Sequence, residues 1–222
     1  RFSITREEAD LFAIESHIRA HNAHKKGNFK EYHVAVKHEK GILNTDEGIR
    51  PNSSLESLSA LKPVFDENGV VTAGNASQIS DGAAACLVMS RRKAEQLELT
   101  PLATVTGYCA TGVDSVDVMS APIPTVQKLW KMNNREGEKD YDLYEHNEAF
   151  ASASLGVMQG LNLKHEKLNV NGGAVAMGHP LGASGCRIVL ALIHALRQSG
   201  GKRGFATACL GGGMATAIEL EI

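Results

Sequence analysis

The segment NVNGGAVAMGHPLGASGCRIV, residues 169–189, places a histidine in a glycine-rich loop that leads directly into the apolar run IVLALIHAL. Glycines let the backbone turn sharply and let a ligand approach the main chain. Ser184 starts a predicted helix, and the positive end of a helix dipole would point back at the loop. A lone histidine is more often structural than functional. At a strand-to-helix turn, however, the run Gly178-His179-Pro180 predicts that His179 acts as a base or an oxyanion donor.

The composition indicates a globular protein, because 43% of the 222 residues are hydrophobic and only 22% are charged. A net charge of −2 gives no reason to expect nucleic acid or an anionic membrane surface as a partner. No apolar run approaches the roughly 20 residues needed to cross a bilayer, and the opening RFSITREEAD has no apolar signal-peptide core. The cysteines show no paired spacing, so we expect reduced thiols in an intracellular protein of the cytoplasm, with mitochondria or another organelle as the alternative. They are Cys86, Cys109, Cys186 and Cys209.

Predicted strands and helices alternate along the chain, which indicates an α/β layered fold with a mainly parallel sheet. A capping box at Thr5 and Glu8 starts a helix that ends at Gly27. The last two strands, joined across 211–213, are expected to be antiparallel, and the helix at 184–198 is expected to lie buried between layers. Further helices are predicted at 55–61, 91–97, 124–132 and 148–161. Strands are predicted at 28–40, 70–77, 81–90, 102–109, 141–145, 168–171, 205–210 and 214–221.

Three loops that follow predicted strands carry unusual side chains, and open α/β sheets bind ligands beyond the carboxyl ends of their strands. The loops are 146–150 (HNEAF), 171–180 and 209–213 (CLGGG). We expect them to bring the Asn147 amide, the His179 imidazole and the Cys209 thiol to one edge. Structural alternatives stay open. Asn147 could be the N-cap of a helix beginning at Glu148, and Cys209 could be a small buried hydrophobe. Glu148 could either support the helix dipole or be a partner of the site. The other three cysteines are interpreted as structural.

The first predicted helix carries a histidine pattern that needs a separate interpretation. His17, His21 and His24 share one face, at a spacing that could hold zinc. No glutamate stands where an H-E-x-x-H motif would supply a base, and the helix is otherwise highly charged. We therefore interpret this face as solvated and predict no metal. The apolar stripe of the helix is predicted at Leu11, Ile14 and Ile18.

Six segments resemble the thiolase family, in the family's order. They are SITREEADLFAIESHIRA, RPNSSLESLSALKPVFDENGVVTAGNASQISDGAAA, GVDSVDVMSAPIP, HNEAFA, NVNGGAVAMGHPLGASGCR and ACLGGGMATAIE. The resemblance implies a five-layered αβαβα fold, of which this chain is the C-terminal half, with a mixed five-stranded sheet and part of the loop domain. Residues 1–79 would belong to the loop domain, 80–98 would complete the first core domain, and 99–222 would form the second. No segment resembles the family's nucleophilic-cysteine motif.

The resemblance also implies a reaction: cleavage of a 3-ketoacyl-CoA by coenzyme A, or the reverse condensation of two acyl-CoAs. One thiolate takes the acyl group, and a second group moves a proton at the α-carbon. By resemblance, Cys209 is this acid/base thiol. His179 activates the nucleophile and, with a water held by Asn147, meets the thioester oxygen, while the Gly211 N–H faces a second oxyanion. Coenzyme A is a substrate and no cofactor is implied. Its binding residues by resemblance are Arg50, Ser57, Phe65, Ala73, Ala76, Ser77, Ala149 and Phe150.

A partner follows from the missing nucleophile. The resemblance implies a complementary thiolase N-terminal half, either a separate subunit or a piece of a cleaved chain. The two halves would form a heterotetramer that acts on acyl-CoA substrates of fatty acid metabolism, with acetoacetyl-CoA as the expected substrate. An isolated half would expose an apolar area too large for a soluble monomer. One alternative is a non-catalytic subunit that binds acyl-CoA or lipid or acts as a scaffold, against which the intact His179 and Cys209 argue. Another is a decarboxylating ketoacyl synthase, which needs no cysteine base. Ala121-Pro122 replaces the family's common Gly-Pro near the acyl pocket, so substrate length stays open.

Overall fold

The computed structural model describes residues 2–222, which form two compact units. Unit 1 joins the chain up to Asp81 with His146–Pro180. Unit 2 joins Gly82–Glu145 with Leu181–Ile222. Neither unit is continuous in sequence, so each depends on contacts between segments far apart along the chain.

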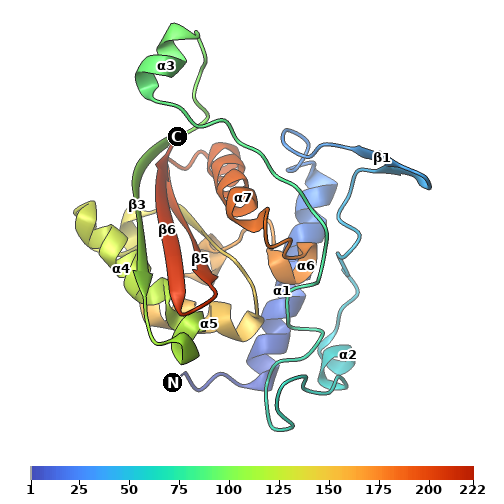
Figure 1. Ribbon diagram of the computed structural model, residues 1–222. Coiled ribbons are helices and arrows are strands. Elements are labelled where there is room, and N and C mark those ends of the chain that lie inside the picture. The colour runs from blue at the N-terminus through green and yellow to red at the C-terminus, as the bar shows by residue number, and fades with distance from the viewer. Residues whose placement is uncertain (1) are drawn as a thin grey trace. The chain divides into compact units, whose positions relative to one another are not determined.

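Unit 1 is built around one long helix, α1, which packs against three shorter helices, α2, α5 and α6 (Figure 1). A small antiparallel hairpin, β1 with β2, extends from the same unit. The elements are α1 (Arg6–Lys26), β1 (Val36–His38), β2 (Gly41–Leu43), α2 (Leu55–Ser59), α5 (Ala151–Leu161), the 3-10 turn His165–Lys167 and α6 (Ala174–Met177).

Local sequence sets the ends of α1 as predicted. The Thr5 side chain accepts a hydrogen bond from the Glu8 N–H at 3.2 Å, and the Glu8 carboxylate accepts one from the Thr5 N–H at 2.7 Å. Gly27 ends the helix in the left-handed region at φ 77°. The predicted apolar stripe is wrong at Leu11 and Ile18, which are 49% and 39% exposed, whereas Ile14 packs against the core of unit 1. Small residues, four of them alanines, make up most of the buried face, which lets neighbouring segments approach closely. That face consists of Ala9, Phe12, Ala13, Ser16, His17, Ala20 and Ala23, with Asp10.

Unit 2 contains a four-stranded sheet in the order β3-β6-β5-β4, with helices packed on it. Helix α4 packs on β3 and β6, and α7 packs on β5 (Figure 1). The elements are α3 (Arg91–Gln96), β3 (Thr104–Gly112), the 3-10 segments Ser115–Ser120 and Glu138–Asp140, α4 (Pro122–Met132), β4 (Leu143–His146), α7 (Ser184–Ser199), β5 (Arg203–Leu210) and β6 (Met214–Glu221). The chain leaves unit 2 at the end of β4.

The sheet differs from the prediction in direction and in size. Both β3 and β5 pair antiparallel with β6, so the prediction of a mainly parallel sheet is wrong. The reason is the tight turn after β5, where Gly212 and Gly213 have φ angles of 81° and 83° and fold β6 back along its neighbour. The antiparallel arrangement of this final pair is as predicted. Residues 168–171 form no strand, so within residues 2–222 this sheet has four strands where the resemblance implied five.

Aromatic packing fills the core of unit 2. The Phe205 ring lies edge-to-face against Tyr141 at 5.0 Å and stacks on Tyr144 at 5.2 Å. Helix α7 is buried from Ile188 onward along one face, but Gly185 near its start is exposed. The helix is therefore buried along one face only, and the predicted burial fails at Gly185 and at residues 197–199.

Several predicted strands do not form. Of 28–40 only Val36–His38 is a strand, and 70–77 contributes only the isolated bridges of Thr72 and Ala76. Residues 81–90 form no strand, and Leu87 and Val88 are 79% and 77% exposed. A β-prone segment needs a neighbouring strand to satisfy its backbone, and this one has none within residues 2–222. No helix in the same range combines the length and the apolar character required to cross a membrane.

Candidate active site

Asn147 and His179, which lie 32 residues apart, meet in unit 1. The side-chain nitrogen Nδ2 of Asn147 lies 3.2 Å from Nε2 of His179. An amide nitrogen can only donate, so in this arrangement Nε2 accepts and the neutral imidazole carries its proton on Nδ1. Asn147 is buried and His179 is half-buried. The structure thus brings together the amide and the imidazole, two of the three groups that are expected at one edge, whereas the third, the Cys209 thiol, belongs to unit 2.

The backbone around Asn147 explains where its side chain points. Helix α5 begins at Ala151 with Phe150 as its N-cap residue, so the interpretation of Asn147 as a helix cap is wrong. Asn147 directly follows the end of β4. Asn169 holds that end, since its side chain accepts from the His146 N–H and donates to the His146 carbonyl, both at 2.9 Å. The Asn147 amide therefore points toward His179 from the end of β4, where hydrogen bonds from Asn169 hold the last residue of the strand.

Gln78 positions the backbone of His179, whereas Asn147 contacts its ring. Gln78 is not among the residues predicted from sequence. The His179 N–H donates to the Gln78 carbonyl at 3.1 Å. The Gln78 side chain donates to the carbonyls of Val175 and Ala176 at 3.0 and 2.9 Å. Gly178 allows this approach, because it has φ 92° and a Cβ there would lie 2.1 Å from the Ser80 hydroxyl oxygen. No local pattern marks Gln78, because its partners lie about one hundred residues away.

The structure decides between the two roles considered for Glu148. The carboxylate is 1% exposed and accepts hydrogen bonds from Ser16 and Asn169 at 2.7 and 2.8 Å. Helix α5 begins only at Ala151, so Glu148 does not lie in its first turn. The helix-dipole interpretation is therefore wrong, and Glu148 is a buried partner of the loops that carry the site.

Five of the residues expected to bind coenzyme A lie together. The Ser77 N–H donates to the Ala149 carbonyl at 3.0 Å, and Ala76 forms an isolated antiparallel bridge with Phe150. The Phe65 ring packs edge-to-face on Phe150 with centroids 5.8 Å apart, while 75% of Phe65 stays exposed. This cluster presents an apolar, partly open surface beside the chain that carries Asn147.

The other three expected residues occupy separate positions in unit 1. The Arg50 side chain is exposed, and its backbone N–H donates to Nδ1 of His17 at 3.1 Å. The Ser57 hydroxyl donates to the Ser54 carbonyl at 2.8 Å, and it accepts from the Ser54 N–H at 3.1 Å, which completes the capping box of α2. Ala73 is exposed in the turn that precedes Ala76.

The histidine pattern of α1 has a different explanation from the predicted solvated face. His24 is exposed, but His17 is only 4% exposed, so the prediction is wrong for His17. Burial, and then the charge of Arg50, lower the pKa of His17 to about 4, which keeps the ring neutral and able to accept from the Arg50 N–H. No group of three or more His, Cys, Asp or Glu side chains within residues 2–222 is arranged to hold a metal.

Both Cys209 and Gly211 lie in unit 2: Cys209 near the end of β5 and Gly211 in the turn between β5 and β6. The Cys209 sulfur is half-buried and lies 4.0 Å from the Met119 sulfur. Burial raises the pKa of the Cys209 thiol, so the group rests protonated at neutral pH. Gly211 is exposed in the turn that follows.

The remaining cysteines are free thiols in different settings. Cys109 is buried, and its thiol donates to the Thr125 carbonyl at 3.3 Å, in agreement with a structural role. Burial and a hydrogen bond with Cys86 raise the pKa of Cys186 to about 11. Cys86 itself is exposed, and the strand predicted at 81–90, which would contain it, does not form.

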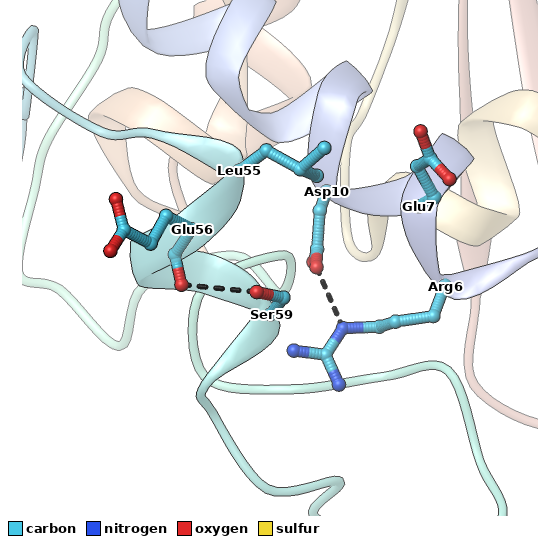
Figure 2. A pocket seen from close by; sticks show the side chains of 6 residues that line it. All are labelled: Arg6, Glu7, Asp10, Leu55, Glu56 and Ser59. Atoms are coloured by element: carbon cyan, nitrogen blue, oxygen red, sulfur yellow. Dashed lines mark hydrogen bonds and ion pairs between the residues drawn. The ribbon is translucent and has the colours of Figure 1, made fainter.

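A separate shallow pocket of about 450 Å³ opens between the start of α1 and α2 (Figure 2). Its polar groups are largely paired with one another. The Arg6 guanidinium donates to the Asp10 carboxylate at 2.8 Å, and the Ser59 hydroxyl donates to the Glu56 carbonyl at 3.0 Å. The residues expected to carry the chemistry lie elsewhere, so we assign no ligand to this pocket.

Comparison with known proteins identifies the class of protein to which this fold and these loops belong. The sequence model of the thiolase N-terminal domain matches residues 1–92, and that of the thiolase C-terminal domain matches residues 99–222. Acetyl-CoA acetyltransferase of Chromobacterium violaceum is 45% identical over 226 aligned residues, which cover 100% of this chain and 57% of that protein.

Solved structures agree with the sequence comparison. The Bacillus anthracis acetyl-CoA acetyltransferase superposes with a TM-score of 0.93 at 40% identity, covering 98% of this chain and 56% of that one. Human mitochondrial 3-ketoacyl-CoA thiolase in complex with CoA gives 0.91 at 38% identity, covering 98% and 55%. The chain therefore belongs to the thiolase family and has the thiolase fold. It spans a little over half the length of the relatives it matches.

Proposed function

We propose that this chain is the acid/base half of an acyl-CoA C-acyltransferase of the acetyl-CoA acetyltransferase type. Its reaction is the reversible thiolysis of a 3-ketoacyl-CoA, with acetoacetyl-CoA as substrate, to acetyl-CoA and a shorter acyl-CoA. The acylated cysteine comes from a complementary thiolase N-terminal half outside these 222 residues.

The observation that carries this proposal is the contact between Asn147 and His179. A thioester oxygen gains negative charge when a thiolate attacks its carbon or when its α-proton is removed, and preorganised donors must meet that charge. The His179 imidazole can donate once protonated, and the Asn147 amide can hold a water next to it. The neutral imidazole can also take the proton of the nucleophilic cysteine on the complementary half, when Nε2 exchanges its hydrogen bond from Asn147 for one from that thiol. Both duties need the ring at a fixed position, which Gln78 and Asn147 provide.

Cys209 supplies the second proton-transfer group in this proposal. A thiol that rests protonated can give its proton to the α-carbon of the leaving acetyl-CoA in the thiolysis direction. The resulting thiolate then accepts the proton of the incoming coenzyme A thiol, so the cycle returns Cys209 to its starting state. The Gly211 N–H is proposed to face the oxyanion of the acylated cysteine.

The proposed coenzyme A path follows the cluster at Phe150. The exposed Phe65 ring and the chain at Ala76 and Ser77 suit the apolar pantetheine arm and its amides. Arg50 and Ser57, both exposed, would meet the nucleotide end, with Ala73 and Ala149 lining the arm. We place this reaction in intracellular fatty acid metabolism.

The proposed partner is supported by apolar side chains that unit 2 leaves open. Leu87 and Val88 are more than three-quarters exposed in a segment that the thiolase N-terminal domain model includes. The relatives are nearly twice as long as this chain, and the part of them that it does not match is long enough to supply the rest of that domain. A heterotetramer of two such pairs is the assembly we propose, since a single half leaves this apolar surface uncovered.

The test is reconstitution. The chain is co-expressed with the part of the C. violaceum acetyl-CoA acetyltransferase that it does not match, and the purified complex is assayed for thiolysis of acetoacetyl-CoA. We expect no turnover from either part alone and measurable turnover from the complex. His179→Ala and Cys209→Ala should each lower kcat by at least about 10²-fold, as loss of an acid/base group typically does.

Two results would oppose the proposal. One is a stable complex of the two parts, with the partner's nucleophile intact, that shows no turnover. The other is full activity in the Cys209→Ala complex. A chain that binds coenzyme A in calorimetry but remains inactive in a well-formed complex would favour the non-catalytic binding subunit.

A further inference from the structure

A carboxylate in unit 1 is buried among three donors, one from α1 and two from the 169–179 loop. The Glu148 oxygens accept hydrogen bonds from the Ser16 hydroxyl of α1 at 2.7 Å and from the Asn169 amide at 2.8 Å. A third bond comes from the Val175 N–H of α6 at 3.1 Å. All three partners donate, which suits the ionised carboxylate. Ser16, Glu148 and Asn169 are each no more than 3% exposed.

The same cluster also binds the loop that leads to His179, through a hydrogen bond and close packing at Gly173. The Ser16 hydroxyl accepts from the Gly173 N–H at 3.0 Å while it donates to Glu148. The carboxylate lies so close to Gly173 that a Cβ there would be 2.2 Å from its carboxyl carbon. The loop therefore packs directly on the acid, and its glycine leaves room for the carboxylate.

We propose that Ser16 and Glu148 are positioning residues, which hold the 169–179 loop against the HNEAF segment so that the Asn147 amide meets the His179 ring. The reason is connectivity. Asn147 is the backbone neighbour of Glu148, and His179 follows Val175 by four residues with only α6 and Gly178 between them. The carboxylate is thus linked to both partners of the 3.2 Å contact between Asn147 Nδ2 and His179 Nε2. Neither residue contacts a reacting atom in this proposal.

Charge explains why a glutamate fits this position. Hydrogen bonds to an ionised group are shorter and stronger than those between neutral groups. Glutamine at 148 would have the same shape but would present an NH₂ group to at least one partner that donates, so part of the cluster must move. Alanine at 16 would remove the hydroxyl that joins α1 to both Glu148 and Gly173 while leaving the carboxylate in place.

The first arm of the test observes His179 directly and does not depend on turnover. The full chain is labelled with ¹⁵N-histidine, and the His179 signals are assigned by comparison with His179→Gln. In the wild type we expect an unprotonated Nε2 at neutral pH. In Glu148→Gln and Ser16→Ala we expect the His179 Nε2 signal and titration midpoint to shift. Signals of exposed His24 should stay in place.

The matched control is Glu219→Gln in unit 2. Glu219 is an equally buried, hydrogen-bonded carboxylate, so its loss destabilises the protein without touching the cluster. We expect no change in the His179 signals of this variant. A shift of His179 in Glu219→Gln that matches the shift in Glu148→Gln would overturn the proposal, because it would show a general effect of destabilisation.

The second arm uses the reconstituted complex and rests on the proposed function. A displacement of about 1 Å in a catalytic group can cost on the order of 10²-fold in rate. We expect kcat to fall by roughly 10- to 100-fold in Glu148→Gln and less in Ser16→Ala, with KM for acetoacetyl-CoA changed by less than about threefold. A proportional rise in KM at unchanged kcat would oppose a positioning role.

The two arms separate the two proposals. If the wild-type complex is inactive but the His179 signals shift as expected, the proposed function fails and the positioning role stands. If Glu148→Gln does not fold, Ser16→Ala decides. If His179 keeps its wild-type signals in every folded variant of the cluster, the positioning role is wrong.

Discussion

Glu219 gives the sharpest test of how unit 2 is held together. It lies on β6, the strand that follows the Cys209 turn, and its side chain is fully buried. One oxygen accepts from Arg135 and Thr106, each at 2.8 Å, and the other accepts from the Tyr141 hydroxyl at 2.5 Å. Burial by itself would raise the pKa of Glu219, but these hydrogen bonds, with the one from Arg135 the strongest, outweigh it and lower the pKa to about 2.

The expected cost of Glu219→Gln follows from these contacts. Glutamine keeps one acceptor oxygen and replaces the other with a donor, so at least one of the three donors loses its partner. In the variant, the Arg135 charge also loses the carboxylate of Glu219 with which it pairs. Breaking a buried ion pair typically costs about 3–5 kcal/mol. The Arg135 side chain is 21% exposed and can be partly rehydrated, which places the expected loss near the low end, at about 3 kcal/mol.

The assay is thermal or denaturant unfolding followed by the fluorescence of Trp130. It is the only tryptophan of the chain, and its ring lies 6.4 Å from that of Tyr141, so it reports on unit 2. A loss of about 3 kcal/mol corresponds to a fall of roughly 6–12 °C in the transition temperature for a protein of this size. Glu221→Gln is the control on the same strand. Glu221 pairs with Arg203 but is 38% exposed, so we expect a loss below about 1 kcal/mol.

The effect should depend on pH in one direction. The folded-state pKa of about 2 lies below the unfolded value of about 4.3. The stabilisation by Glu219 is therefore complete above about pH 4.5 and is lost as the pH falls toward 2. The gap between the wild type and Glu219→Gln should narrow across that window. A gap that stays constant from pH 7 to pH 3, or one no larger than for Glu221→Gln, would refute the reasoning.

Three further changes test other parts of the chain. Gly178→Ala should destabilise unit 1 by about 1–2 kcal/mol because of its positive φ, whereas Gly182→Ala, whose added Cβ meets nothing within 4 Å, should be nearly neutral; these melts are followed by far-UV circular dichroism, because Trp130 reports on unit 2. Asn75→Ala removes a 2.8 Å hydrogen bond to the buried Asp10, so we expect a loss of about 1–3 kcal/mol and faster amide exchange across 70–77; unchanged exchange would contradict this. Thr5→Ala removes the cap of α1 and should cost about 1 kcal/mol, and a loss below the error of the melt would count against the capping box.

Structure that depends on neighbours in sequence was predictable. The capping box at Thr5 and the glycine at 27 define α1 to the residue, and the glycines at 211–213 mark the final hairpin. The segments quoted above also identify the family, because short motifs of fixed spacing survive in sequence. The class of the fold and the loops that carry Asn147 and His179 follow from that information.

Features that depend on distant partners were not predictable from sequence. The apolar segment 81–90 reads as a strand, yet whether it pairs depends on a neighbouring strand that local sequence does not supply. The buried face of α1 is made of small residues because of what packs against it, which its own periodicity does not reveal.

The candidate site shows the same division. Sequence alone determined which residue types stand at the ends of which strands, since propensity, capping and turn chemistry act over a few residues. Only the tertiary structure decided that Asn147 contacts His179, that Gln78 holds the His179 backbone, and that Ser16 of α1 reaches Glu148. Hydrogen bonds between groups separated by 32 to 132 residues along the chain depend on how the segments pack, and no local pattern encodes them.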